Sequence, residues 1–263
     1  MSKTAVISEQ GLRWRMEDAY ILRHALVHAA DIFAGVYDGH CGDYAAAYAS
    51  QTLHLHFAHH LQQGKKIEQA FINSYQKVSQ ELSRVQSGTT AAHFYLLGRE
   101  LSVANAGDSR IIIVSKEGVR QLSRDHRLDD PQEMDRILSY GAEISYPYVL
   151  RQGMGLMPTR SLGDSFFESV GVISTPDVHQ ERIQDRDLWL IAGCDGLFDV
   201  LDNQEVAGIA RSYSDVRELA EGLSQEVLIQ RMGTDNLTII VLALQPGPGM
   251  AKMTKLKNWR FEL

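Results

Sequence analysis

The chain has 263 residues, a formal net charge of -7 and an apolar fraction of 44%, which is enough to build one large domain or two small ones. The negative charge argues against nucleic-acid binding, because that binding depends on basic patches that meet phosphates. Two cysteines make no disulfide framework and suit a reducing compartment. The N-terminus has too few apolar residues for a signal peptide, and no apolar run approaches the ~18 residues of a membrane span. We therefore expect a soluble, cytoplasmic protein that acts without a membrane.

Short apolar runs with β-branched residues predict strands, and longer stretches with helical periodicity predict helices. In chain order, strands are expected near 4–8, 19–26, 32–37, 89–97, 100–106, 109–115, 187–194 and 236–244. Helices are expected near 42–62, 66–85, 131–141, 203–213 and 215–231, with Asp202 and Ser214 as N-caps of the last two. The order is no regular βαβ alternation, so it indicates sheets packed on each other with helices outside.

Residues 124–186 are richer in Pro, Gly and charge than the rest of the chain. This composition predicts an irregular, flap-like insertion beside a functional site. We expect one domain over residues 1–246 that contains the insertion. The remaining residues, 247–263, form a short basic tail, which is more often a solvated terminus than a functional element.

Three aspartates, far apart in the sequence, each stand where an apolar run meets a loop. Asp38 and Asp195 each close such a run, and Asp235 precedes the last one. Carboxylates at strand ends can converge in one cleft, where they repel each other unless a cation joins them. The pattern therefore predicts a hard-metal site with oxygen ligands, of the kind that Mg²⁺ and Mn²⁺ prefer.

Neighbouring residues extend this acidic pattern. Gly39 follows the first aspartate, and because it has no Cβ its carbonyl can approach a metal closely. Glu17 and Asp18 add an acidic pair before another strand, and Asp199 lies one turn beyond the second aspartate if a helix begins there. Each acidic residue alone is more often a turn residue or a helix cap. The joint pattern favours two ions about 3.5–4 Å apart, which polarise a phosphoryl oxygen and generate a nucleophile.

A phosphate substrate also needs a cation to hold it and a proton for its leaving group. Arg13 lies just before the acidic pair and can hold a phosphate bidentately, although an isolated arginine there is usually solvated. A serine or threonine alkoxide is a poor leaving group, so a general acid is required near neutral pH. His40, two residues after Asp38, is the candidate acid, although alone it is more often a turn histidine that bonds the backbone.

Seven short motifs that carry these residues follow one another along the chain. They are Arg13-x-x-Met-Glu-Asp18, Val36-Tyr-Asp-Gly-His-Cys-Gly42, Ser87-Gly-Thr-Thr-Ala91, Asn105-Ala-Gly-Asp-Ser-Arg110, Thr159-Arg-Ser-Leu-Gly-Asp164, Gly193-Cys-Asp-Gly-Leu-Phe-Asp199 and Asp235-Asn236. In this order they resemble the type 2C, metal-dependent protein serine/threonine phosphatases, over about residues 5 to 244. Any one motif is weak, whereas seven in order are specific.

The resemblance implies an α+β fold, a four-layer α/β/β/α sandwich of two central antiparallel sheets flanked by helices. It implies that Asp38 bridges two Mn²⁺ or Mg²⁺ ions, that Gly39 contributes its carbonyl, and that Asp195 and Asp235 are direct ligands. Asp108 matches a residue that binds a third, weaker ion together with Asp195. Three further carboxylates would act mainly through metal-bound waters, namely Glu17, Asp18 and Asp199.

By the same resemblance Arg13 would hold the phosphate and His40 would act as the acid, while Arg160 and Asp164 match a motif interpreted as structural. A bridging hydroxide would attack directly, with no phosphoenzyme. The expected partner is a phosphorylated protein, and the expected state is a monomer. The chain departs from the family pattern at Cys41, where a second small residue is usual, and in the stretch before Arg160.

Other functions stay open. A family member with weak catalysis could serve as a binding scaffold, and a metal-dependent site could act on small phosphoesters instead of proteins. A cysteine phosphatase is excluded because neither cysteine is followed six positions later by arginine. His56 and His60 lie one turn apart and could bind zinc, but no further ligand stands at good spacing, so an exposed helix face is favoured.

Overall fold

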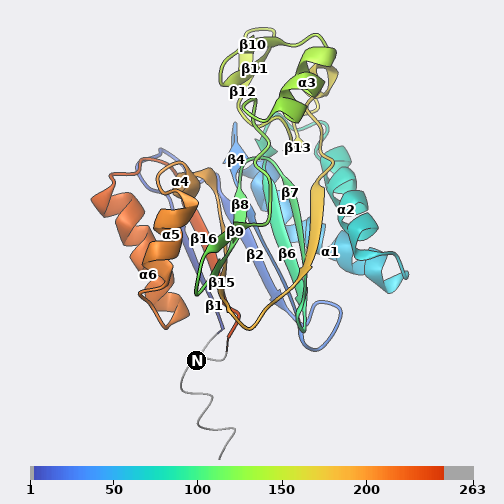
Figure 1. Ribbon diagram of the computed structural model, residues 1–263. Coiled ribbons are helices and arrows are strands. Elements are labelled where there is room, and N and C mark those ends of the chain that lie inside the picture. The colour runs from blue at the N-terminus through green and yellow to red at the C-terminus, as the bar shows by residue number, and fades with distance from the viewer. Residues whose placement is uncertain (1–2, 246–263) are drawn as a thin grey trace, which may run out of the picture.

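A computed structural model describes residues 3–245, so the basic tail expected at 247–263 lies outside the described residues. Two five-stranded antiparallel sheets pack face to face, and helices cover the outer face of each (Figure 1). The four-layer α/β/β/α sandwich is therefore confirmed. Within residues 3–245, no helix is both long enough and apolar enough to cross a bilayer.

The first sheet joins the two ends of the described chain, because β1 pairs only with β16. Its strands, in spatial order, are β1 (Thr4–Glu9), β16 (Leu237–Ala243), β15 (Asp187–Gly193), β8 (Arg110–Ser115) and β9 (Val119–Gln121). The helices on its outer side are α4 (Asp195–Phe198), α5 (Asn203–Ala210) and α6 (Val216–Gln225), which continues as a π-helical turn at Glu226–Gln230.

The second sheet holds four of the expected strands, near 19–26, 32–37, 89–97 and 100–106, and one strand from further along the chain. In spatial order it contains β14 (Asp177–Arg182), β7 (Glu100–Ala106), β6 (Ala91–Leu97), β3 (Asp31–Tyr37) and β2 (Ala19–His24). Two long antiparallel helices, α1 (Tyr44–Gln62) and α2 (Ile67–Glu81), cover its outer face (Figure 1).

The central strands are largely apolar because both of their faces are buried. In β3, Phe33 and Tyr37 belong to the core beneath α1 and α2, whereas Ala34 and Val36 belong to the core between the two sheets. This alternation follows from the two-residue period of a strand. Packing on both faces thus fixes the position of each sheet, and with it the position of the strand ends that carry the aspartates.

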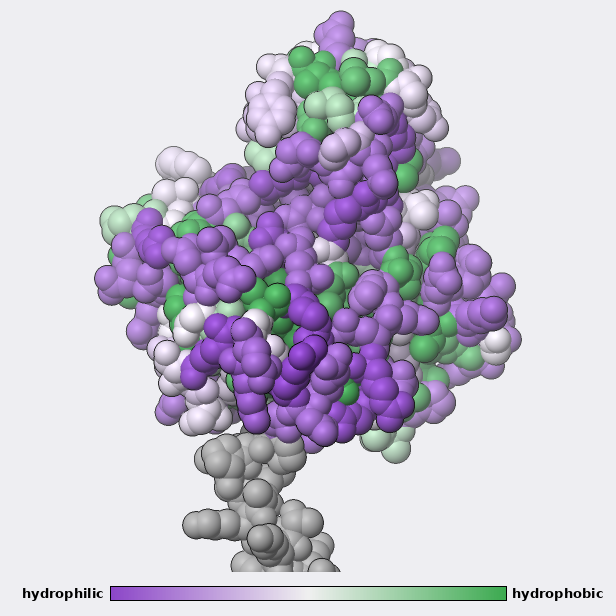
Figure 2. Space-filling model, in the orientation of Figure 1, coloured by the Kyte–Doolittle hydropathy of each residue, from purple (hydrophilic) through white to green (hydrophobic). Residues whose placement is uncertain are grey.

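The insertion rises from one end of the sandwich as a small unit with its own core (Figure 1). It contains α3 (Pro131–Ser139), β10 (Glu143–Ser145), β11 (Tyr148–Arg151), β12 (Met154–Leu156) and a 3₁₀ turn at Glu168–Val170. Figure 2 shows hydrophobic residues gathered on it. Two large apolar side chains of this unit, Leu138 and Met154, are exposed. Beneath it a small sheet contains β13 (Leu162–Gly163), β5 (Gly88–Thr89) and β4 (Gly39–His40).

One buried carboxylate ties this insertion to the sandwich. Glu133, in α3, accepts hydrogen bonds from Arg136, Arg160 and Thr159 at 2.6–3.2 Å. Arg160 also donates to Asp177, in β14, at 2.8 Å. Burial alone would raise the pKa of Glu133, but the two arginines hold that pKa well below its usual range. The structural interpretation of Arg160 agrees with these contacts.

Two local features differ from expectation. Ser214 is not the N-cap of α6, since the cap is Asp215, whose carboxylate accepts from the backbone N–H groups of Arg217 and Glu218. Strand β14 lies within the stretch expected to be irregular and was missed. Its sequence, Asp-Val-His-Gln-Glu-Arg, is polar because β14 is an edge strand with a half-exposed face.

We expect Phe57→Ala to lower the free energy of unfolding by about 3–5 kcal/mol, because truncating a buried Phe leaves a cavity. The Phe57 side chain is fully buried, and its ring lies 4.3 Å from that of Phe71 and 5.2 Å from those of Phe33 and Tyr95, centroid to centroid. Urea denaturation measures the loss. Leu55→Ala, on the exposed side of the same helix, is the matched control, and equal losses in the two variants would contradict the assigned core.

Candidate metal centre

The predicted carboxylates converge because strand register brings their strand ends together. Strand β2 begins beside the end of β3, with Ala19 opposite Tyr37. Asp18, just before β2, and Asp38, just after β3, are therefore neighbours at the same end of the sheet. The end of β15 lies beside the start of β16 in the other sheet, with Gly193 opposite Ile239. The two packed sheets therefore deliver their acidic residues to one end of the sandwich.

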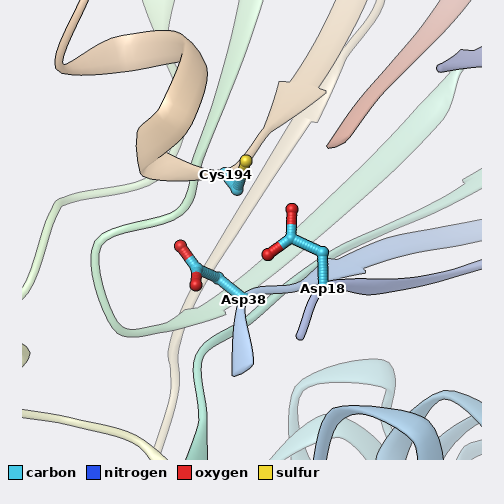
Figure 3. Close-up of side chains that lie close together, drawn as sticks. All are labelled: Asp18, Asp38 and Cys194. Carbon is cyan, nitrogen blue, oxygen red and sulfur yellow. The ribbon is translucent and has the colours of Figure 1, made fainter. Parts of the chain in front are cut away.

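The centre of the cluster is formed by Asp18, Asp38 and Cys194. One potential ligand atom from each lies within 4.8 Å of the others, and Figure 3 shows the two aspartate side chains next to each other below the cysteine. The Oδ2 atom of Asp18 is buried and has no hydrogen-bond partner among the described residues. An unpartnered buried carboxylate oxygen is a costly group, which a bound cation would satisfy.

The electrostatics of the cluster also favour a bound cation. Burial raises the pKa of Asp38 well above its ordinary value, and the charges of Asp195 and Asp18 raise it further. Burial and the charge of Asp108 raise the pKa of Asp195 to about 7, and burial raises that of Asp18 to about 6. These oxygen donors fit a hard divalent ion, whose charge would stabilise the ionised carboxylates.

Cys194 is a member of the cluster that sequence analysis noted only as a free cysteine. Its side chain is buried, and its Sγ accepts a hydrogen bond from the backbone N–H of Thr238 at 3.2 Å. Burial, followed by the charges of Asp18 and Asp38, raises the pKa of the thiol well above its ordinary value. A neutral thiol is a poor ligand for a hard cation, so the oxygen atoms remain the candidate ligands.

Arg13 and Asp235 form the open side of the cluster. The Nη2 of Arg13 lies 2.5 Å from the Oδ2 of Asp235, and 56% of the arginine side chain is exposed. The next residue, Asn236, accepts from the N–H of Glu17 at 2.8 Å and donates to the carbonyl of Arg15 at 3.0 Å. Asn236 thus fastens the loop that carries Arg13 onto the start of β16, a role that its place in a motif did not reveal.

Glu17 and Gly39 meet through their backbones. A Cβ added to Gly39 would lie 2.2 Å from the carbonyl oxygen of Glu17, so no larger residue fits. The Glu17 side chain points to the following loop, where its Oε1 accepts from the N–H of Gly42 at 2.5 Å. Sequence analysis attributed Gly39 to a close approach of its own carbonyl, and the structure adds that the glycine brings the acidic pair against β4.

His40 lies beside Asp164, with 2.8 Å between Nε2 and Oδ2. Asp164 also accepts from the hydroxyl of Ser161 at 2.5 Å. A Cβ on Gly88 would come within 2.4 Å of both side chains, so glycine is required at that position. Burial lowers the pKa of His40, but the charge of Asp164 outweighs it and raises the pKa above the ordinary value. Asp164, interpreted as structural, is therefore a direct partner of the candidate acid.

Asp108 and Asp199 are joined by an arginine that sequence analysis missed. The Nε of Arg127 lies 2.7 Å from Oδ2 of Asp108, and its Nη1 and Nη2 lie 2.9 and 3.0 Å from the two oxygens of Asp199. Nη2 also lies 3.4 Å from Asp195. Asp108, expected from the resemblance to bind a third divalent ion, is thus paired with a guanidinium in this structure.

Two antiparallel sheets that end in a shared carboxylate cluster, with an arginine at its open side, form a sandwich with a candidate metal centre at one end. The family model for protein phosphatase 2C matches residues 2–236 of the chain. Probable protein phosphatase 2C 45 of Oryza sativa subsp. japonica is 34% identical over 248 residues, which cover 92% of this chain and 87% of the relative. Probable protein phosphatase 2C 59 of Arabidopsis thaliana is 32% identical over 242 residues, covering 89% and 77%.

Solved structures agree on the fold. A serine-threonine phosphatase 2C from Toxoplasma gondii superposes with a TM-score of 0.82 at 22% identity, covering 92% of this chain and 94% of that one. The chain therefore belongs to the protein phosphatase 2C family, whose members are metal-dependent serine/threonine protein phosphatases.

We expect Mn²⁺ to stabilise the metal-free protein, by roughly 2.7 kcal/mol per site at a hundredfold excess over the dissociation constant. The gain should be larger at pH 8 than at pH 5. Because the pKa values of Asp18 and Asp195 are raised to about 6 and about 7 in the folded chain, folding favours their protonated forms. Their contribution is present below the ordinary carboxyl pKa and is lost as pH rises through about 7. Thermal melting with and without Mn²⁺ measures both effects.

Asp38→Asn is the matched variant for this measurement. It removes one buried charge, so it should raise the melting temperature of the metal-free protein at pH 8 while it weakens the stabilisation by Mn²⁺. Unchanged melting of the wild type on adding millimolar Mn²⁺, or an unchanged Mn²⁺ effect in the variant, would contradict the metal centre.

Proposed function

We propose that this protein hydrolyses phosphoserine and phosphothreonine in phosphorylated proteins, with residues 1–246 as one catalytic domain. The observation that carries the proposal is the buried cluster around Asp38, whose carboxylates repel each other and open toward Arg13. Two Mn²⁺ or Mg²⁺ ions bound there would neutralise the phosphate and supply the activated water that attacks phosphorus directly, without a phosphoenzyme.

The assignment of roles follows the resemblance and the contacts. Asp38, Gly39, Asp195 and Asp235 would hold the ions directly. The remaining acidic residues of the cluster would act through water, and these are Glu17, Asp18 and Asp199. The burial of the central carboxylates would keep bulk water from bound ions, which would strengthen their electrostatic effect on a substrate.

Arg13 would bind the phosphate of the substrate. Its guanidinium is half exposed at the rim of the cluster and is held at one edge by Asp235, so its other donors remain available. A planar guanidinium can bind two phosphate oxygens at once, which orients the ester for in-line attack. Asn236 supports this role because it keeps the Arg13 loop against β16.

His40 would donate a proton to the seryl or threonyl oxygen as it leaves. Asp164 holds the imidazole by its contact at Nε2 and favours its protonated form. Ser161 and Gly88 fix Asp164 in turn, since the serine bonds its carboxylate and the glycine leaves room for it. Asp164 is thus a positioning residue for the acid.

The first test is hydrolysis of a phosphothreonine peptide by the wild type with Mn²⁺, by the wild type with chelator, and by Asp235→Asn. We expect turnover with Mn²⁺, none with chelator, and a loss of about 10²-fold or more in the variant, because it removes an ionised ligand. Asp185→Asn, at a largely exposed carboxylate paired with Arg99, is the control and should retain full activity.

Failure of folded, Mn²⁺-loaded wild type to turn over the peptide would favour a binding scaffold instead. A clear preference for a sugar phosphate over the phosphopeptide would contradict the assignment as a protein phosphatase and would instead indicate a hydrolase of small phosphoesters.

We expect His40→Ala to slow phosphoserine hydrolysis by about 10²–10⁴-fold, the usual contribution of a general acid. Hydrolysis of an aryl phosphate should suffer much less, because its leaving group needs little protonation. Asp164→Asn should also slow phosphoserine hydrolysis more than aryl phosphate hydrolysis, but by a smaller factor. The comparison of the two substrates is the measurement, with His179→Ala on the half-exposed edge strand as control. Equal losses on both substrates would remove His40 from the acid role.

A further inference from the structure

The base of the insertion carries one arginine into the acidic cluster. Arg127 contacts carboxylates from two separate segments: Asp108 in the loop that leads from β7 in the second sheet to β8 in the first, and Asp195 and Asp199 at the two ends of α4. Only 21% of its side chain is exposed, and Asp108 is 97% buried by the same measure, being 3% exposed. The guanidinium therefore stands inside the cluster and not on its surface.

The backbone of the chain fixes this position. The N–H of His126 donates to the carbonyl of Gly107 at 3.0 Å, and the N–H of Gly107 donates to Nδ1 of His126 at 3.1 Å. On the other side, the N–H of Thr159 donates to the carbonyl of His126 at 2.8 Å. The residue before Arg127 is thus fastened to the residue before Asp108. The arginine is delivered to this carboxylate by hydrogen bonds that do not involve its own side chain.

The geometry matches the chemistry of a guanidinium. Its Nε binds one carboxylate and its two terminal nitrogens bind both oxygens of another, a fork that lysine cannot reproduce with a single ammonium. A divalent ion between Asp108 and Asp199 would have to break these charge-assisted bonds and also face a like charge at close range. Two cations cannot share these ligands at low cost.

We propose that Arg127 is a built-in cation that takes the place of the third divalent ion expected at Asp108, so that the protein binds two exchangeable ions and excludes a third. The proposal rests on the proposed two-ion site but concerns a different set of contacts. It also implies that the insertion and the metal centre are joined by one side chain, because Arg127 lies three residues before the Asp130 N-cap of α3.

The test is the number of Mn²⁺ ions bound per chain, measured on the full-length, metal-free protein by titration while free Mn²⁺ is followed by electron paramagnetic resonance. We expect two ions in the wild type up to millimolar Mn²⁺, and three in Arg127→Ala. The third site of the variant should be tighter than any third site of the wild type by on the order of tenfold or more, the change expected when a charge-assisted hydrogen bond no longer competes.

Two further variants identify the new site. Arg127→Ala combined with Asp108→Asn should return to two ions, because the added site has lost a ligand. Arg124→Ala removes the same charge three residues away, from a side chain that pairs with Asp130 and Asp177, and should keep two ions.

Each outcome decides a separate claim. Three ions in the wild type, or two ions in both the wild type and Arg127→Ala, would overturn the role of Arg127 alone. No bound Mn²⁺ in the folded wild type would instead overturn the proposed metal centre. If Arg127→Ala does not fold, Arg127→Gln and the wild-type count still decide the matter, since a third ion in the wild type is sufficient to contradict the exclusion.

Discussion

Mutual repulsion among buried carboxylates is the constraint around which the rest of this structure is arranged. Asp18, Asp38 and Asp195 come from both sheets, and each lies where burial and the neighbouring charges disfavour ionisation. Keeping these carboxylates charged and buried costs free energy, which a bound cation or protonation offsets. Because the two rigid sheets hold this cluster in place at one end of the sandwich, it is a preorganised negative site for a cation and, through that cation, for a phosphate ester.

The scaffold holds the carboxylates together by fixing both the strand ends and the loops that carry them. The apolar cores fix the strand ends, while tight contacts between loops fix the side chains, as where Gly39 meets Glu17 and Gly88 makes room for Asp164. Arginines then surround the cluster: Arg13 at its open rim and Arg127 at the base of the insertion. One guanidinium is exposed enough to meet a substrate, and the other is enclosed by carboxylates.

Sequence reasoning identified the parts of the site that follow from local pattern. Asp38, Asp195 and Asp235 stand at the ends of apolar runs, so strand prediction alone indicated that they converge, and the two-sheet sandwich followed from ordered motifs. The role of Arg127 could not be found in this way, because its partners lie 19 to 72 positions away and no periodicity connects a loop arginine to them. Strand β14 was missed for a related reason, since an edge strand need not be apolar.

The pairing of β1 with β16 has a consequence for how the protein is made. Strand β1 has no other partner in its sheet, and the loop that follows it is fastened by Asn236, at the start of β16. Strand β1, which is synthesised before the rest of this domain, must therefore wait for β16 at the end of the domain before it can be paired. Asp235, just before β16, is likewise made late, so the candidate metal centre cannot be complete until the last strand of the domain has been synthesised.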